Sequence, residues 1–205
     1  MSVDELNYEF CIMNIIPASA EQAESIASLI MMAMNHECCQ NFAGPQHTLA
    51  DFHRMMTTLV RREDSQYSYR NAWVALDDKT TDGKPVVAGV IVGYDGADLR
   101  RLREAFLQAA KKYLDQDFSG MDDETQAGEY YIDSLAVDTR YRHQGLATLL
   151  LRKLIDQKGR KQPVGLLVDK GNPSAERLYR RLGFEYVNDT TWGGHEMRHL
   201  QTTIS

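Results

Sequence analysis

The residues from 129 to 183 alternate between strand and helix patterns, and this alternation restricts the fold more than any other feature. EYYIDSLAV, Glu129 to Val137, has the composition of a strand, and a helix is expected from Gly145 to Gln157. PVGLLVD, Pro163 to Asp169, reads as a buried strand, and a short helix follows from Asn172 to Gly183. Strands joined through a helix run parallel with a right-handed crossover. We therefore predict that this part of the sheet is parallel.

The other segments predict further strands and amphipathic helices. Helices are expected at Pro17–Asn35 and Thr48–Arg62, and strands at Tyr8–Ile16, Asn71–Asp78, Pro85–Asp95, Phe184–Asp189 and His195–Gln201. The turn-rich KTTDGK makes the second and third strands an antiparallel hairpin. No repeat or linker divides the 205 residues. We predict one α/β domain over residues 1–205, with a mixed central sheet of about six to seven strands flanked by helices.

An insert, Asp95 to Gly128, separates the third and fourth predicted strands. It contains a helix pattern, Leu99 to Leu114, and then an acidic stretch that ends GMDDETQAG. The helix has an apolar face, made by Leu99, Leu102, Ala105, Phe106, Ala109, Ala110, Tyr113 and Leu114. Such a face must be covered, either as the wall of a cleft or by a second subunit. The sequence leaves both open, and with them a homodimer.

Charge is distributed unevenly along a chain whose formal net charge is −6. Asp138 to Arg181 holds eleven Lys and Arg against four Asp and Glu, a net of +7, and the remainder has a net of −13. This split favours an anionic ligand on the basic segment. The alternative is a set of solvated helix faces, which we prefer for Arg152, Lys153, Arg177 and Arg180. Overall acidity, with no finger, RNP or basic-helix motif, argues against a nucleic-acid partner.

The compartment and metal content are predicted from the termini and the cysteines. MSVDELNYEF lacks the pattern of a secretory signal, and the apolar run Ile26–Met34 is too short to span a membrane. Three cysteines, two of them adjacent, make no disulfide framework, so a cytoplasmic location is expected. Cys11, Cys38 and Cys39 are interpreted as small buried hydrophobes. Cys38, Cys39 and His36 match no common ligand spacing, so no metal is expected.

The loop RYRHQG, residues 140–145, places basic side chains and a glycine just before a helix. A helix start carries backbone N–H groups without intrahelical partners and is electropositive. Phosphate groups bind there when a glycine lets them approach the backbone. The loop is neither a Walker loop nor a dinucleotide fingerprint, because the required Lys-Ser/Thr pair and glycine triplet are missing.

The loop is followed downstream by a second motif. The two motifs are RHQGLA, residues 142–147, and NPSAERLYRRLGF, residues 172–184, each at a strand-to-helix junction. Together they resemble the GNAT superfamily of N-acetyltransferases. The resemblance is strong from Glu129 to Val187, extends in pattern over Tyr8 to Tyr94, and does not explain the insert. Many members have glycine at the position of Ala147, but alanine is small enough for a helix start. The resemblance implies a GNAT-like sheet and an acyl-CoA site, most often for acetyl-CoA.

The resemblance also implies which residues hold acetyl-CoA. The pyrophosphate would bind the backbone N–H groups of His143 to Thr148, and the pantetheine arm would pair with the strand at Leu135 to Val137. This requires a gap between that strand and the one carrying Val164 to Val168. Asn172 would both cap its helix and touch the cofactor. The implied set is Leu135, Ala136, Val137, Arg142, His143, Gln144, Gly145, Leu146, Ala147, Thr148, Asn172 and Tyr179.

Two residues are candidates for the chemistry of direct transfer in a ternary complex. Tyr179 matches the tyrosine that in many GNAT members protonates the leaving thiolate, although its helical stripe also fits a core aromatic. Asp133 is the candidate base, because a carboxylate in an apolar strand is costly unless it faces a wet cleft. A hydrogen-bonding or recognition role is the alternative for Asp133. Glu129, Glu37 and a water chain are rival bases.

The expected function is N-acetyl transfer from acetyl-CoA to a primary amine, carried by a small molecule or a peptide. A non-catalytic acyl-CoA-binding or sensing protein of the same fold is the alternative. Between Tyr113 and Thr139 the chain has eight acidic residues and no Lys or Arg. If this stretch lines the cleft it would attract a cationic amine, and otherwise it is a solvated loop. Neither a membrane nor nucleic acid is an expected partner.

Overall fold

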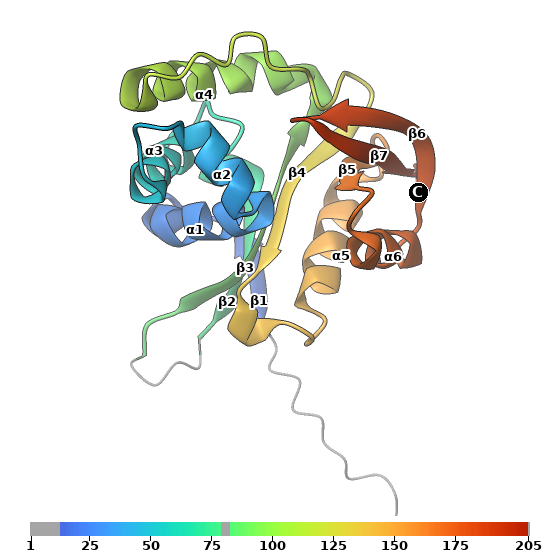
Figure 1. Ribbon diagram of the computed structural model, residues 1–205. Coiled ribbons are helices and arrows are strands. Elements are labelled where there is room, and N and C mark those ends of the chain that lie inside the picture. Colours follow the sequence, from blue (N-terminus) through green and yellow to red (C-terminus); the bar gives the residue numbers. More distant parts are fainter. Residues whose placement is uncertain (1–12, 79–82, 205) are drawn as a thin grey trace, which may run out of the picture.

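A seven-stranded sheet forms the centre of the computed structural model, which describes residues 13–78 and 83–204 (Figure 1). The strands are β1 (Asn14–Pro17), β2 (Ala72–Asp77), β3 (Val86–Asp95), β4 (Tyr130–Val137), β5 (Val164–Asp169), β6 (Phe184–Trp192) and β7 (His195–Thr202). Their order in the sheet is β1-β2-β3-β4-β5-β7-β6. Neighbouring strands are antiparallel except β4 and β5, which are parallel. The parallel pair is the one predicted from the strand and helix alternation.

Helices cover both faces of this sheet (Figure 1). They are α1 (Ala23–Met34), α2 (His36–Ala43), α3 (Leu49–Arg61), α4 (Leu99–Leu114), α5 (Leu146–Lys158) and α6 (Pro173–Arg181). Side chains of a strand alternate between its two faces, so adjacent residues of β3 enter different cores. Val90 joins the core of α1, α3 and α4, whereas Ile91 joins the core of α5. The predicted mixed α/β fold with a helix inserted between the third and fourth strands is confirmed.

The helix predicted from Pro17 to about Asn35 begins at Ala20 as a short 3-10 turn and continues as α1 to Met34, so its predicted end is confirmed, but the helix that follows, α2, was not predicted. Asn35 has a φ of 69°, a left-handed conformation that asparagine tolerates better than most residues. Its side-chain Oδ1 accepts a hydrogen bond from the backbone N of Cys38 at 2.9 Å and so caps α2. The strand predicted at Tyr8–Ile16 is seen as Asn14–Pro17, and its earlier part lies outside the described residues.

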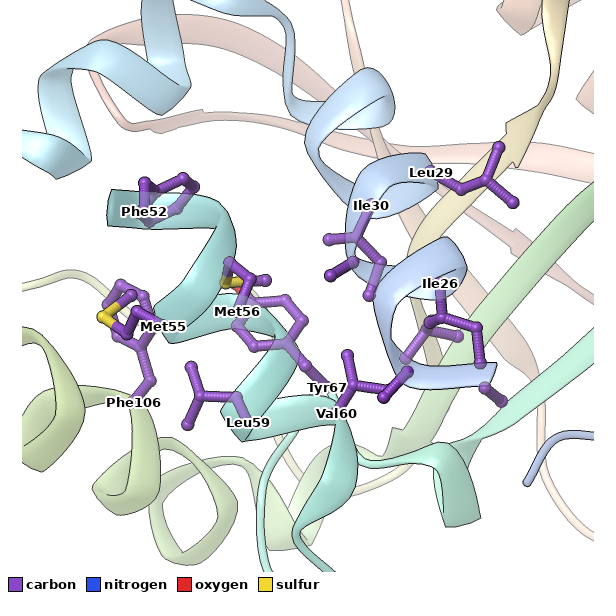
Figure 2. Packing of buried hydrophobic residues seen from close by; sticks show 14 of the residues in the cluster. Ile26, Leu29, Ile30, Phe52, Met55, Met56, Leu59, Val60, Tyr67 and Phe106 are labelled. Carbon is purple, nitrogen blue, oxygen red and sulfur yellow. The ribbon is translucent and has the colours of Figure 1, made fainter. Parts of the chain in front are cut away.

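The apolar face of α4 is covered within the chain, so it needs no second subunit. Figure 2 shows Phe106 of α4 beside Met55 and Leu59 of α3 in one buried cluster. The rings of Phe106 and Tyr67 lie 6.0 Å apart, centroid to centroid. Tyr113, which the pattern assigned to this face, is 44% exposed. The insert is therefore part of the main core, and a homodimer stays a prediction without support from this face.

Candidate functional site

Strands β4 and β5 separate partway along their length and leave a gap in the sheet. Their register pairs Tyr130 with Val164, Tyr131 with Gly165 and Ile132 with Leu166, and ends there. On its other edge β4 remains paired with β3 as far as Val137. Among the described residues, the edge of β4 from Asp133 to Val137 that faces β5 therefore has no strand as its partner. This is the gap that an added strand-like ligand requires.

A cavity of about 870 Å³ lies at this gap. Its wall includes β4 from Asp133 to Val137, β5 from Leu167 to Asp169, and the start and middle of α6. Another part of the wall is made by the turn between β6 and β7, by the end of α1 and by α2. The insert contributes Asp117, Phe118, Gly120, Met121, Asp122 and Glu124. Segments from the whole length of the chain therefore meet at the end of the β4–β5 pairing.

The loop before α5 has the backbone conformation of an anion-binding helix start. Gly145 at the N-cap has a φ of 78°, and no side chain caps α5. A Cβ added at Gly145 would meet no atom within 4 Å, so space is open in front of the glycine. Arg142 lines the cavity and its Nε donates to the carbonyl of Val137 at 3.2 Å. The uncapped N–H groups are thus open to an anionic ligand.

The residues of the predicted phosphate loop take different positions. Arg142 and Ala147 line the cavity, whereas His143, Gln144 and Gly145 are exposed beside it. Thr148 is half-buried. The Leu146 side chain is 4% exposed and packs in the core under α5, so only its backbone is available to a ligand.

Asn172 caps α6 and also lines the cavity. Its Oδ1 accepts a hydrogen bond from the backbone N of Ala175 at 3.1 Å, and Pro173 takes the first helical position, where the missing N–H is no loss. Its backbone N donates to the carbonyl of Asp169 at 2.8 Å, which joins the end of β5 to the helix. The capping role predicted from the sequence is confirmed, and the side chain also borders the gap.

Tyr179 lines the cavity from α6 and packs against the core at the same time. Its ring meets the Phe184 ring edge to face, with centroids 5.7 Å apart. Among the described residues, none hydrogen-bonds to the Tyr179 hydroxyl. Burial raises the pKa of Tyr179 to about 12, so the hydroxyl keeps its proton at neutral pH. Both readings of Tyr179, core aromatic and available proton donor, are compatible with this position.

Asp133 lies on β4 in the cavity wall, and three side chains lie within hydrogen-bond distance of its carboxylate. Ser134 Oγ donates to Oδ1 at 2.8 Å, and Gln66 Nε2 and the Tyr94 hydroxyl each lie 3.2 Å from Oδ2. Burial raises the pKa of Asp133 above its ordinary value, although these donors and Arg103 oppose the rise. A half-buried carboxylate with a raised pKa is suited to exchange protons in the cavity.

The rival carboxylates lie elsewhere. Glu129 is 3% exposed, and its Oε2 accepts from His199 and Gln201, each at 2.8 Å, while Oε1 accepts from Thr125 at 2.6 Å. Burial alone would raise the pKa of Glu129, but these hydrogen bonds hold it below its ordinary value. Neither Glu129 nor Glu37 on α2 lines the cavity.

Four residues near Asp133 were not predicted as site residues. Gln66 and Tyr94 contact its carboxylate, and Glu124 and Arg103 lie behind Tyr94. The Tyr94 hydroxyl lies 2.9 Å from Glu124 Oε1, and Glu124 forms an ion pair with Arg103. Glu124 belongs to the acidic stretch whose position relative to the cleft the sequence left open. The position of Glu124 in that stretch was the one sequence signal for it, and nothing in the sequence distinguishes Glu124 from its acidic neighbours.

The two described cysteines differ in burial, and neither belongs to a metal-binding group. Cys39 is buried as expected, but Cys38 is half-buried and lines the cavity, which corrects its assignment to the core. Burial raises the pKa of Cys38, and that of Cys39 to about 12, so both remain thiols. Within residues 13–78 and 83–204, no group of three or more His, Cys, Asp or Glu is placed to hold a metal ion. Cys11 lies outside this part of the chain.

No helix in the described part of the chain has the length and apolar character to cross a membrane.

The search of curated proteins found no match. Solved structures match the whole fold. A crystal structure described as an acetyltransferase has a TM-score of 0.74 and 26% identity, covering 94% of this chain and all of its own. An N-acetyltransferase from Staphylococcus aureus Mu50 has a TM-score of 0.74 and 24% identity, covering 92% of this chain and all of its own.

A third structure, Arabidopsis thaliana NAA60 in complex with acetyl-CoA, has a TM-score of 0.58 and 17% identity, with coverage of 94% and 99%. At that identity it shows the fold alone. The profile of the Acetyltransferase (GNAT) family matches residues 41–184, which is more than half of the sequence. This range includes the divided β4–β5 pair, the uncapped start of α5, Asp133 and Tyr179. The chain belongs to the GNAT family of acetyltransferases.

Proposed function

We propose that this protein transfers an acetyl group from acetyl-CoA directly to a primary amine. The observation that carries the proposal is the cavity at the β4–β5 gap, which Asp133 and Tyr179 line from two sides of the sheet opening. The fold neighbour NAA60 was solved with acetyl-CoA, and another neighbour, the NatC complex, with CoA and a Gag peptide. These two complexes support the choice of acyl donor.

The residues along the gap suit an acyl-CoA. The edge of β4 that faces β5 offers backbone groups of Leu135 and Val137 to the amides of the pantetheine arm, and Ala136 lies between them in the cavity wall. The backbone N–H groups from His143 to Thr148 and the Arg142 guanidinium would hold the pyrophosphate. Asn172 would contact the cofactor from the start of α6. When bound, acetyl-CoA supplies the thioester, whose acyl carbon is the electrophile.

The rest of the wall suits a cationic acceptor. Five carboxylates line the cavity: Asp117, Asp122 and Glu124 of the insert, Asp133 of β4 and Asp169 of β5. Among the described residues, Arg142 is the one Lys or Arg in the wall. Phe42, Phe118 and Met121 add apolar surface there. A negative wall raises the local concentration of a cation, so a primary amine that arrives as ammonium is the acceptor we propose.

The two candidate catalytic residues complete the proton balance of the transfer. Asp133 takes a proton from the ammonium group, directly or through water, and leaves a neutral amine. The amine nitrogen forms the new C–N bond as the C–S bond breaks, and the second N–H proton, which the amide does not keep, passes to solvent. The Tyr179 hydroxyl donates its proton to the departing thiolate and regains one from solvent. No acyl-enzyme is needed, so Cys38 has no nucleophilic part in this scheme.

The test is a panel of amines with purified protein and acetyl-CoA, measured as release of free thiol. Small monoamines, polyamines, amino acids and short peptides separate the acceptor classes. Binding of CoA is measured in parallel by calorimetry.

The alternative is an acyl-CoA-binding protein without catalysis, and the hydrogen bonds that Ser134 and Gln66 already donate to Asp133 favour it. CoA binding together with no thiol release above the rate without protein, across the whole panel, would select this alternative.

A further inference from the structure

A buried ionic group lies behind the acceptor wall. The Arg103 side chain of α4 and the Glu124 side chain of the insert are each 5% exposed, and they form an ion pair. Arg103 Nη1 also donates to the carbonyl of Asp122 and to Asp123 Oδ1, both at 3.1 Å. These contacts attach the segment that carries Glu124 to α4. Because α4 is part of the main core, Glu124 has a fixed position.

Tyr94 connects this ionic group to Asp133. The Tyr94 side chain is 2% exposed, and its hydroxyl lies 2.9 Å from Glu124 Oε1 and 3.2 Å from Asp133 Oδ2. A phenol has one hydrogen, so it donates fully to one carboxylate at a time. The two carboxylates therefore compete for one donor.

The charges of this group are not balanced. Glu124 and Asp133 are two buried or half-buried carboxylates, and Arg103 is the one guanidinium among them. Asp123 takes part of Arg103, although it is 34% exposed and reaches solvent. The other groups around Asp133 are neutral: Gln66, Ser134 and the phenols of Tyr67, Tyr94 and Tyr131, whose pKa values burial raises. A buried negative charge without a partner is costly, so the group favours one more proton or cation at Asp133.

We propose that Glu124 and Tyr94 are positioning residues that hold Asp133 ready to accept the acceptor's proton. The inference rests on the proposed role of Asp133 in acetyl transfer. The negative charge of Glu124 favours the protonated form of Asp133, whereas the Tyr94 hydrogen bond favours the carboxylate. The insert thus supplies the residue that sets the basicity of a side chain on β4, through a phenol on β3.

The test compares the variants Glu124→Gln and Tyr94→Phe with a matched control, Asp123→Asn. Asp123 neighbours Glu124 and also contacts Arg103, but its hydrogen bonds do not include Tyr94. The readout is the ¹³C carboxyl shift of Asp133 followed against pH in the protein without substrate. Where an acceptor is known, the acidic limb of the pH–kcat profile is a second readout.

The two variants should shift the titration of Asp133 in opposite directions. Glu124→Gln should move it to lower pH by about one unit, and Tyr94→Phe should move it to higher pH by a similar amount. Asp123→Asn should move it by much less. Loss of stability alone would not produce shifts of opposite sign.

Shifts of the same sign, or no shift in either variant, would show that Glu124 and Tyr94 do not position Asp133 in this way. If Glu124→Gln fails to fold, Tyr94→Phe, which removes one hydroxyl, decides the matter against Asp123→Asn. Because the titration needs no turnover, it also separates the two proposals. If the protein acetylates no amine, the proposed function is contradicted. If Asp133 titrates at the same pH in the variants as in the wild type, the positioning role of Glu124 and Tyr94 is contradicted.

Discussion

Gly165 of β5 lies directly against the carboxylate of Glu129, so that a Cβ at residue 165 would occupy the place of Glu129 Oε2. That oxygen accepts hydrogen bonds from His199 and Gln201 of β7, each at 2.8 Å. One glycine therefore lets a buried carboxylate connect the start of β4 to β7 across β5. This connection lies at the paired end of β4 and β5, and the cavity lies where their pairing stops.

Gly165→Ala should destabilise the protein, because the added methyl group displaces the Glu129 carboxylate from its donors. Overpacking of this kind costs about 1–3 kcal/mol. The measurement is the thermal midpoint. Gly120→Ala is the control, since a Cβ there meets no atom within 4 Å and the residue has no positive φ. Equal midpoints for the two variants would mean that Glu129 moves aside without loss.

Gly145→Val should weaken CoA binding, because a β-branched side chain fills the open space in front of the α5 start. It also strains a backbone with a φ of 78°. Gly183→Val is the matched control, with a φ of 87°, no atom within 4 Å of its Cβ and a position outside the cavity wall. Calorimetry should show a loss of affinity for the first variant only. Wild-type affinity in Gly145→Val would move the pyrophosphate away from this loop.

Tyr179→Phe should lower kcat by about 10²–10⁴-fold, because it removes the proton donor but keeps the ring against Phe184. Since burial raises the pKa of Tyr179 to about 12, its deprotonation should not limit the wild-type rate up to pH 10. Tyr186→Phe, at a tyrosine that is 50% exposed, is the control. Unchanged turnover at saturating acceptor would leave Tyr179 as a packing residue alone.

Asp133→Asn should lower turnover most where the acceptor amine is still protonated, and should leave CoA affinity nearly unchanged. In the wild type the rate should fall as pH drops through the pKa of Asp133, because only the carboxylate accepts a proton. Burial raises that pKa, so the fall should occur above the ordinary aspartate value of about 3.9. A pH–rate profile that is the same in height and shape in both proteins would assign the base to solvent.

Met121→Ala should raise KM for the acceptor and leave CoA binding unchanged, because Met121 lines the cavity from the insert. Replacing the whole insert with a turn would not be a clean test, since Phe106 and Leu114 of α4 are buried in the main core. Gln108→Ala, on the exposed side of α4, is the control. Acceptor kinetics identical to the wild type would confine the insert to a structural role.

Several elements of the fold could be predicted from local signals in the sequence. Residues a few positions apart specify the alternation from residue 129 to 183, the Asn172 cap and the α4 apolar face. Such signals act through backbone geometry and hydrogen bonds within one turn or strand, so they are readable before the chain folds. Helix α2 was missed because its eight residues, HECCQNFA, are too few to show a clear apolar repeat.

Tertiary structure alone decided which groups meet at the cavity. Glu129 directly precedes β4 and Asp133 lies in the middle of it. The Glu129 carboxylate is enclosed by donors from β7, whereas Asp133 lines the cavity. The partners of Asp133 come from far along the chain: Gln66 is 67 residues away and Tyr94 is 39. Glu124 meets Tyr94 across 30 residues. Contacts at such separations depend on how the sheet and insert close on each other, and no local pattern encodes that closure.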